Sequence, residues 1–160
     1  MENQKEKDQM HIQLQQIDER NIQECLACKV SPKQECFIAS NADSLREAAE
    51  AENKAVARPF AICADGKVVG FAMFAFDEQN EEPKDRYWLW RFMIDASLQG
   101  RGYGKAALQE IIRYFKEQGV KEVTLSTKAE NTRALHLYHA AGFQENGAWN
   151  EEEIVLKLYL

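Results

Sequence analysis

The chain has 160 residues, 45% of them hydrophobic, and carries a formal net charge of −6. This length suits a single domain over residues 1–160 with a sizeable core, and no apolar run approaches the roughly 20 residues of a membrane span. The negative charge disfavours nucleic acid as a partner and fits a cationic one.

The N-terminus and the cysteines indicate the compartment. Residues 1–9 are polar and charged, so we expect a flexible tail and not a secretory signal. Without such a signal we expect a cytoplasmic, reducing compartment, in which a disulfide framework is disfavoured. Cys25 and Cys28 form a C-x-x-C pair, but a zinc site would need two further ligands at suitable spacing. We therefore predict buried thiols on an amphipathic helix and no metal site.

Hydrophobic periodicity and turn residues divide the chain into alternating strands and helices. In chain order we predict a strand over 10–17, a helix between Asp18 and Ser31-Pro32, a helix over 43–55, strands over 59–64, 67–76 and 87–94, a helix over 104–118, a strand over 121–127, a helix from Asn131 to Gly142, and strands over 143–149 and 153–160. Asp18 is expected to cap the first helix, and Asp65-Gly66 to form a hairpin turn. The order predicts an α/β fold: a mixed, mostly antiparallel twisted sheet of six to seven strands with about four helices over both faces.

The stretch Gln99-Gly100-Arg101-Gly102-Tyr103-Gly104-Lys105 joins a strongly apolar strand to a helix. Its glycines let a ligand approach the backbone, and the helix N-terminus that follows offers unpaired N–H groups to an anion. The sequence fits neither the P-loop nor the dinucleotide fingerprint, but it reads as Q-x-x-G-x-G. A phosphate cradle and a simple tight connection with two solvated cations both remain open on this pattern alone.

The second informative stretch begins at Asn131 and reads N-x-x-A-x-x-x-Y-x-x-x-G-F. The helical spacing of Ala134, Tyr138 and Ala141 places the Tyr138 ring on the face that meets the sheet. By itself this pattern is also typical of a core tyrosine. Together, the two motifs and the strand order resemble the GNAT superfamily of acyl-CoA-dependent N-acyltransferases. The resemblance covers residue 10 to the C-terminus, and the segments 70–74 and 87–95 look like the bacterial spermine/spermidine acetyltransferases.

The resemblance implies acetyl-CoA as cosubstrate and a role for each matching position. The backbone of the strand end would pair with the pantetheine arm, the amides of the glycine loop would hold the pyrophosphate, and Asn131 would contact the thioester region. Tyr138 would be the general acid that protonates the departing thiolate, a reasonable role for a phenol. The implied cofactor-binding residues are Phe92, Met93, Ile94, Gln99, Gly100, Arg101, Gly102, Tyr103, Gly104, Lys105, Asn131 and Tyr138.

The general base is harder to place. Small-amine members of the family often carry a carboxylate on the strand before the glycine loop, where this chain has Trp88 and Trp90. Glu78 is the first candidate, with Glu24, Glu35 and Asp77 behind it, and each of these also reads as a solvated surface acid. The expected substrate-binding residues are Glu24, Glu35, Asp77, Glu78, Trp88 and Trp90.

The expected function is transfer of an acetyl group to a primary amine of a polyamine, by direct attack in a ternary complex. The loop 77–85 carries five carboxylates, which with the tryptophans could hold a polycation by ion pairs and cation–π contacts. The alternatives are another amine, such as a protein N-terminus or an aminoglycoside, and a CoA-binding sensor without turnover. We expect neither a nucleic acid nor a membrane as partner, and leave open whether the chain forms a homodimer.

Overall fold

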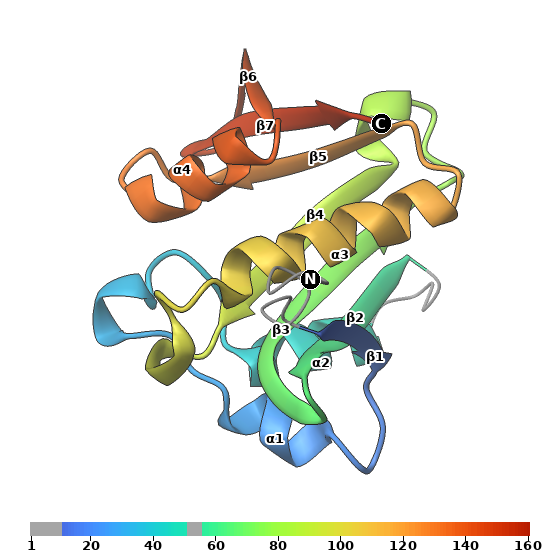
Figure 1. Ribbon diagram of the computed structural model, residues 1–160. Coiled ribbons are helices and arrows are strands. Elements are labelled where there is room, and N and C mark those ends of the chain that lie inside the picture. The colour runs from blue at the N-terminus through green and yellow to red at the C-terminus, as the bar shows by residue number, and fades with distance from the viewer. Residues whose placement is uncertain (1–10, 51–55) are drawn as a thin grey trace, which may run out of the picture.

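The computed structural model of the chain describes residues 11–50 and 56–160. Its framework is one seven-stranded sheet with the order β1-β2-β3-β4-β5-β7-β6 (Figure 1). All neighbours in the sheet are antiparallel except β4 and β5, which are parallel. The strands are β1 (Ile12–Gln16), β2 (Ala57–Ala64), β3 (Lys67–Phe76), β4 (Tyr87–Ile94), β5 (Glu122–Thr127), β6 (Gln144–Asn150) and β7 (Glu153–Tyr159). The predicted mixed, mostly antiparallel sheet is confirmed.

Within the described residues, four α-helices cover the two faces of this sheet, as predicted. They are α1 (Ile22–Ala27), α2 (Asn41–Glu50), α3 (Tyr103–Glu117) and α4 (Thr132–Ala140). Leu108, Ile111 and Phe115 of α3 pack into the larger hydrophobic cluster, together with Phe74 of β3. Cys25 of α1 and Leu45 of α2 pack into a second cluster against Phe71, Met73 and Met93. Because side chains alternate along a strand, β3 and β4 contribute to both clusters.

Short 3-10 helices, which the periodicity did not indicate, occupy three connections. They span Pro32–Gln34, Pro83–Asp85 and Ala96–Leu98. The first follows α1, and Pro32 starts it, since proline at the first helical position gives up no hydrogen bond. Each is too short to show a 3.6-residue hydrophobic period, which explains why sequence reasoning missed them.

Two local predictions near the N-terminus were wrong. Asn21, and not Asp18, is the N-cap of α1. The Asp18 carboxylate instead accepts the backbone N–H of Arg20 at 2.8 Å, which closes a turn before the helix. Strand β2 begins at Ala57 and runs through Pro59, which is tolerated because β1 ends opposite Phe60 and leaves Pro59 without a partner on that side.

The remaining predictions concern the N-terminal tail, the end of the second helix, the cysteines and membrane-spanning helices. The expected tail over 1–9 and the expected last turn of the second helix over 51–55 lie outside the described residues. Cys25, Cys28 and Cys63 are buried free thiols, whereas Cys36 is exposed. Within residues 11–50 and 56–160, no helix is both long and apolar enough to cross a membrane.

Candidate active site

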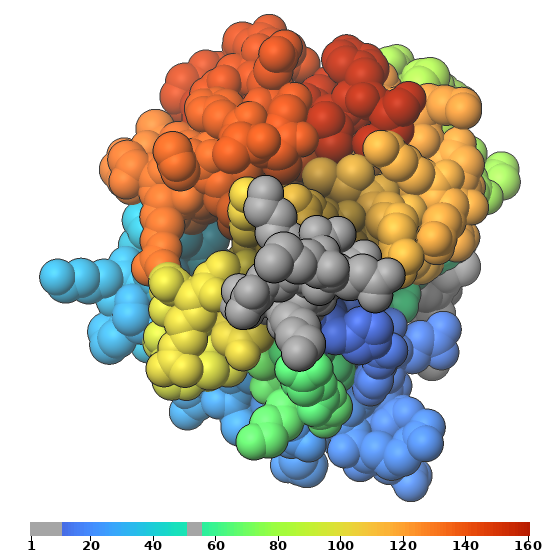
Figure 2. Space-filling view, in the orientation of Figure 1, coloured from blue at the N-terminus to red at the C-terminus, as the bar shows by residue number. Residues whose placement is uncertain are grey.

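A cavity of about 1080 Å³ opens where β4 and β5 separate. Its walls come from the segment before α2, from β4, from the glycine loop and α3, and from β5 and α4. The segments near residues 31–40, 99–102 and 128–133 meet at one edge of the molecule in the space-filling view (Figure 2). One cavity therefore joins parts of the chain that are widely separated in sequence.

The separation of the two parallel strands leaves backbone groups of β4 available. β4 and β5 are paired only at Trp88 and Thr124, near the start of β4. Phe92, Met93 and Ile94 lie beyond this pair, bond to β3 on one side, and line the cavity. A strand edge of this kind can accept an extended amide-containing chain as if it were another strand.

The glycine loop follows β4 directly and ends in α3. Gly100 and Gly102 have φ values of 77° and 90°, a left-handed conformation that glycine adopts without strain. Gly102 is the N-cap of α3 and provides no side chain to cap it, so the first N–H groups of the helix stay available to an anion. Of the seven predicted loop residues the cavity is lined by Gln99, Gly100, Gly102, Gly104 and Lys105, and not by Arg101 or Tyr103. Tyr103 packs against the hydrophobic core instead.

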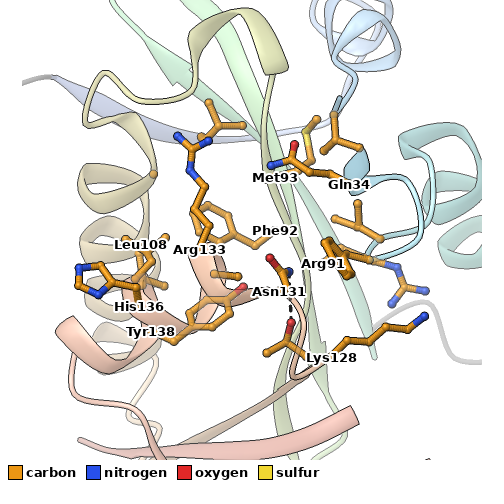
Figure 3. A pocket seen from close by; sticks show the side chains of 18 of the residues that line it. Gln34, Arg91, Phe92, Met93, Leu108, Lys128, Asn131, Arg133, His136 and Tyr138 are labelled. Carbon is orange, nitrogen blue, oxygen red and sulfur yellow. Dashed lines mark hydrogen bonds between the residues drawn. The ribbon is translucent and has the colours of Figure 1, made fainter. Parts of the chain in front are cut away.

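Tyr138 reaches the cavity from α4, and its ring is held in place by Phe143 at a centroid distance of 5.9 Å. Its hydroxyl has no hydrogen-bond partner among the described residues and points toward Asn131 (Figure 3). Burial raises the pKa of the Tyr138 phenol above its ordinary value, and the charge of Glu153 raises it further. The phenol is therefore neutral near pH 7 and able to donate its proton.

Asn131 lies at the N-terminus of α4 without capping it through its side chain. Its Nδ2 donates to Thr127 Oγ1 at the end of β5, at 3.3 Å, and the residue lines the cavity. Asn131 and Tyr138, both predicted from the second motif, thus face the same space. The side-chain amide still has its carbonyl oxygen free to accept a hydrogen bond from a ligand.

The predicted acidic residues separate into two groups. Glu35 lines the cavity, but Glu24, Asp77 and Glu78 do not. Glu24 accepts the backbone N–H of Val68 at 3.2 Å and lies beside a smaller hollow. Glu78 lies next to the Tyr87 hydroxyl, at the end of β4 where β4 and β5 are still paired. No carboxylate of the loop 77–85 lines the cavity.

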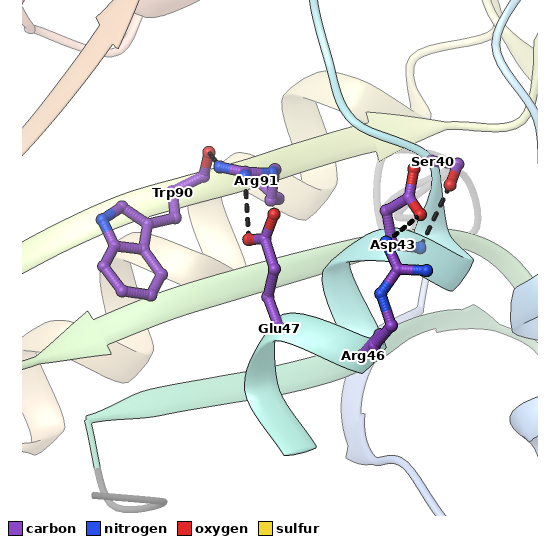
Figure 4. A network of polar contacts seen from close by, with 6 residues as sticks. All are labelled: Ser40, Asp43, Arg46, Glu47, Trp90 and Arg91. Carbon is purple, nitrogen blue, oxygen red and sulfur yellow. Dashed lines mark hydrogen bonds and ion pairs between the residues drawn. The ribbon is translucent and has the colours of Figure 1, made fainter. Parts of the chain in front are cut away.

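Trp88 and Trp90 both line the cavity. A register shift in the pairing of β3 and β4 leaves Trp90 without a partner in β3, and the residue is 41% exposed. The next residue, Arg91, turns toward α2 and pairs with Glu47 at 3.2 Å (Figure 4). Its buried Nε has no hydrogen-bond partner among the described residues.

Several lining residues were not predicted. Glu153, at the start of β7, accepts a hydrogen bond from Ser126 Oγ at 3.3 Å, and Asn150 Nδ2 donates to the same Ser126 oxygen at 3.4 Å. The cations of the cavity wall are Arg91, Lys105, Lys128 and Arg133, against the carboxylates Glu35 and Glu153. This excess of cations suits a ligand with phosphate groups. The sequence signal for Arg133 was available, because it lies inside the second motif; Glu153 showed none.

The donor set of a metal site is missing from the described part of the chain. No group of three or more His, Cys, Asp or Glu residues there could hold a metal ion. The groups that line the cavity are backbone amides, a phenol, an asparagine and cations, which fit a phosphorylated thioester such as acetyl-CoA.

Comparison with known proteins gives the family. The sequence model of the acetyltransferase (GNAT) family matches residues 22–143. The chain is 35% identical over 153 residues to the spermine/spermidine N(1)-acetyltransferase of Bacillus subtilis (strain 168), covering 92% of this chain and 99% of that protein. A more distant relative, the [ribosomal protein bS18]-alanine N-acetyltransferase of Escherichia coli (strain K12), is 29% identical over 86 residues, 54% of each chain.

Solved structures share the fold at low sequence identity. The spermidine N-acetyltransferase of Vibrio cholerae, in complex with CoA and spermine, has a TM-score of 0.69 at 17% identity, covering 93% of this chain and 94% of that one. An acetyltransferase of Thermus thermophilus has a TM-score of 0.74 at 19% identity, covering 95% and 99%. The chain thus belongs to the GNAT family and is an N-acetyltransferase that uses acetyl-CoA.

Proposed function

We propose that the protein acetylates a primary amine of a polyamine such as spermine or spermidine, by direct attack on acetyl-CoA in a ternary complex. The observation that carries the proposal is that two kinds of groups line one cavity. The glycine loop and the edge of β4 suit the cosubstrate, whereas Trp88, Trp90, Glu35 and Glu153 suit an amine. The Bacillus subtilis relative named for spermine and spermidine supports the same substrate class.

Each part of the site would have its own role in the reaction. The amides at the start of α3 hold the pyrophosphate, and the β4 edge aligns the pantetheine arm, with a backbone N–H near Ile94 polarising the thioester carbonyl. The neutral amine attacks the carbonyl carbon, and as the C–N bond forms it gives up a proton to the Glu153 carboxylate, directly or through water. The C–S bond then breaks, and Tyr138 donates its proton to the departing sulfur.

We propose Glu153, in place of Glu78, as the carboxylate that accepts the proton of the amine. It lines the cavity, is held by Ser126, and lies close enough to Tyr138 for its charge to raise the pKa of the phenol. Glu35 lines the cavity as well and offers a second carboxylate for an ammonium group farther along a polyamine. Glu78, at the paired end of β4, could bind only a part of the substrate that extends beyond the cavity.

An acceptor panel tests the substrate class. The release of CoA thiol is followed with spermine, spermidine, butylamine, an aminoglycoside and a peptide with a free N-terminus, at low and high salt. We expect kcat/KM to be highest for the polyamines and the advantage over butylamine to narrow with salt, because exposed ion pairs are screened. Equal rates for monoamines and polyamines without a salt effect would contradict the proposal. Binding of acetyl-CoA without turnover of any amine would indicate a sensor.

Variants of the carboxylates test the site itself. Glu153→Gln and Glu35→Gln should raise KM for spermine and leave KM for acetyl-CoA unchanged. Glu152→Gln is the matched control, because Glu152 is exposed and does not line the cavity. Glu78→Gln is the comparison at the paired end of β4. If only Glu78→Gln affects spermine, the amine lies outside the cavity and our assignment of Glu153 is wrong.

A further inference from the structure

Two glutamine side chains, 65 positions apart in sequence, form a reciprocal pair of hydrogen bonds at the cavity. Gln34 Nε2 donates to Gln99 Oε1 at 3.1 Å, and Gln99 Nε2 donates to Gln34 Oε1 at 3.0 Å. Each amide thus acts as donor and acceptor toward the other, and both are partly buried. We call this contact the amide pair.

The amide pair is connected to β4, to the glycine loop and to the segment before α2. Gln99 Nε2 also donates to the carbonyl of Ile94, the last residue of β4, at 2.9 Å. Gln34 Oε1 accepts the backbone N–H of Ser31 at 3.3 Å, which fixes the short helix that contains Gln34. Gln99 is the first residue of the glycine loop. The residues that follow Gln34, from Glu35 to Ala39, line the cavity. We call residues 34–39 the acceptor segment.

A third residue, Arg133 of α4, also contacts the amide pair. Arg133 Nη1 of α4 donates to Gln99 Oε1 at 3.3 Å, so this oxygen is shared between an arginine and Gln34. The same guanidinium lies over the glycine loop, where a Cβ added at Gly100 would be 3.5 Å from Arg133 Nη2. A pyrophosphate bound at that loop would attract the guanidinium more strongly than a neutral amide oxygen does.

We propose that the amide pair couples acetyl-CoA binding to the acceptor segment. When phosphate groups draw Arg133 away, Gln99 Oε1 is left to Gln34, and the segment is held more firmly against β4. Because the pair has a different set of contacts in the two states, acetyl-CoA and the amine each bind more tightly in the presence of the other. The proposal rests on the proposed position of the amine beside the acceptor segment, but not on the amine being a polyamine.

The chain contains its own reporter of this coupling. Cys36 lies on the acceptor segment and is exposed, whereas Cys25, Cys28 and Cys63 are buried. Alkylation of Cys36 by iodoacetamide, followed by mass spectrometry, therefore measures the accessibility of the segment. Acetyl-CoA has no free thiol and does not compete for the reagent. Cys36→Ser confirms the site of labelling.

The experiment compares the parent with Gln34→Ala, Gln34→Glu and the control Lys33→Ala. Lys33 neighbours Gln34 but does not line the cavity. In the parent we expect acetyl-CoA to slow alkylation of Cys36 by about tenfold, a usual size for coupling between sites. In Gln34→Ala the slowing should fall below about twofold, while calorimetry still shows acetyl-CoA binding, because backbone amides hold the phosphates. Gln34→Glu keeps the acceptors for Gln99 Nε2 and Ser31 but loses the donor to Gln99 Oε1, so it should not restore the effect.

A second readout tests reciprocity. The amine with the highest turnover in the panel should tighten the binding of CoA in the parent, and not in Gln34→Ala. Equal protection of Cys36 in the parent and in Gln34→Ala would mean that acetyl-CoA simply shields the thiol, and would overturn the proposal. Absence of both protection and reciprocity in the parent would overturn it as well. If polyamines are not acetylated in the panel, the proposed substrate is wrong, but the coupling is decided separately by these two readouts. Any amine that the protein acetylates can be used for the reciprocity measurement.

Discussion

The replacement of Tyr138 by phenylalanine separates the two interpretations of this residue most directly. The ring packs against Phe143 and is 8% exposed, so phenylalanine keeps the packing. The hydroxyl has no partner among the described residues, and its removal leaves no donor or acceptor of those residues unpaired. We therefore expect the free energy of unfolding to change by less than about 1 kcal/mol. The perturbation is confined to the proton that Tyr138 can donate.

The size of the kinetic effect follows from the environment of the phenol. Because burial and Glu153 raise the pKa of Tyr138, the group is fully protonated at neutral pH and its proton is available in every molecule. Loss of a positioned acid should lower kcat by about 10- to 1000-fold, which corresponds to about 1.4 to 4 kcal/mol in the barrier. Ionisation of Tyr138 itself should cause no loss of activity in the parent below about pH 10, its ordinary pKa.

The assay measures kcat by release of CoA thiol, with acetyl-CoA affinity from calorimetry and Tm from thermal unfolding. We expect kcat to fall while the affinity and Tm stay within error of the parent. Pre-steady-state kinetics establishes whether the chemical step limits turnover, since slow product release can hide a change in chemistry. An unchanged kcat with chemistry limiting would make Tyr138 an ordinary core residue and refute its catalytic role.

Three further outcomes are expected. Gly102→Val should abolish acetyl-CoA binding in calorimetry, because valine strains the left-handed backbone and blocks the approach of the phosphates. Arg101→Ala, which lies outside the cavity, should weaken this binding only modestly. Equal binding by the two variants would contradict a phosphate-binding role of the glycine loop. Burial raises the pKa of Cys25 to about 12 and of Cys28 to about 11, so the folded thiols stay protonated while unfolded thiols ionise above about pH 8.5. The free energy of unfolding should thus keep its full value below that pH and fall by on the order of 2 kcal/mol per thiol by pH 10. Urea unfolding measures this loss, and replacement of both cysteines by alanine should remove it. Gly70→Ala should lower the free energy of unfolding by roughly 1–3 kcal/mol, because its Cβ would collide with the Met93 carbonyl oxygen. The urea midpoint should fall accordingly, and an unchanged midpoint would show that β4 shifts without cost.

The amino-acid sequence determined the fold class and the parts of the site that arise from local chemistry. Strand β4, the glycine loop and the start of α3 are consecutive, so their joint geometry follows from glycine conformations and helix-end chemistry within about a dozen residues. Helical spacing likewise predicted the face of α4 on which the Tyr138 ring lies, whereas its role in the site was implied only by the family resemblance. Even so, Asp18 shows that a local rule fails when a competing turn uses the same carboxylate.

The position that we propose for the amine depends on the tertiary structure. Glu78 follows β3 and was a reasonable candidate, but β4 and β5 are paired at that end and separate at the other. The end at which β4 and β5 separate depends on the parallel pairing of these two strands, which are joined through a helix. No local sequence pattern encodes this pairing. Glu153 and Gln34 approach the site through β7 and a three-residue helix, from opposite ends of the chain. Periodicity specifies the face a side chain occupies, but its neighbours across the cavity are set by the order of strands in the sheet.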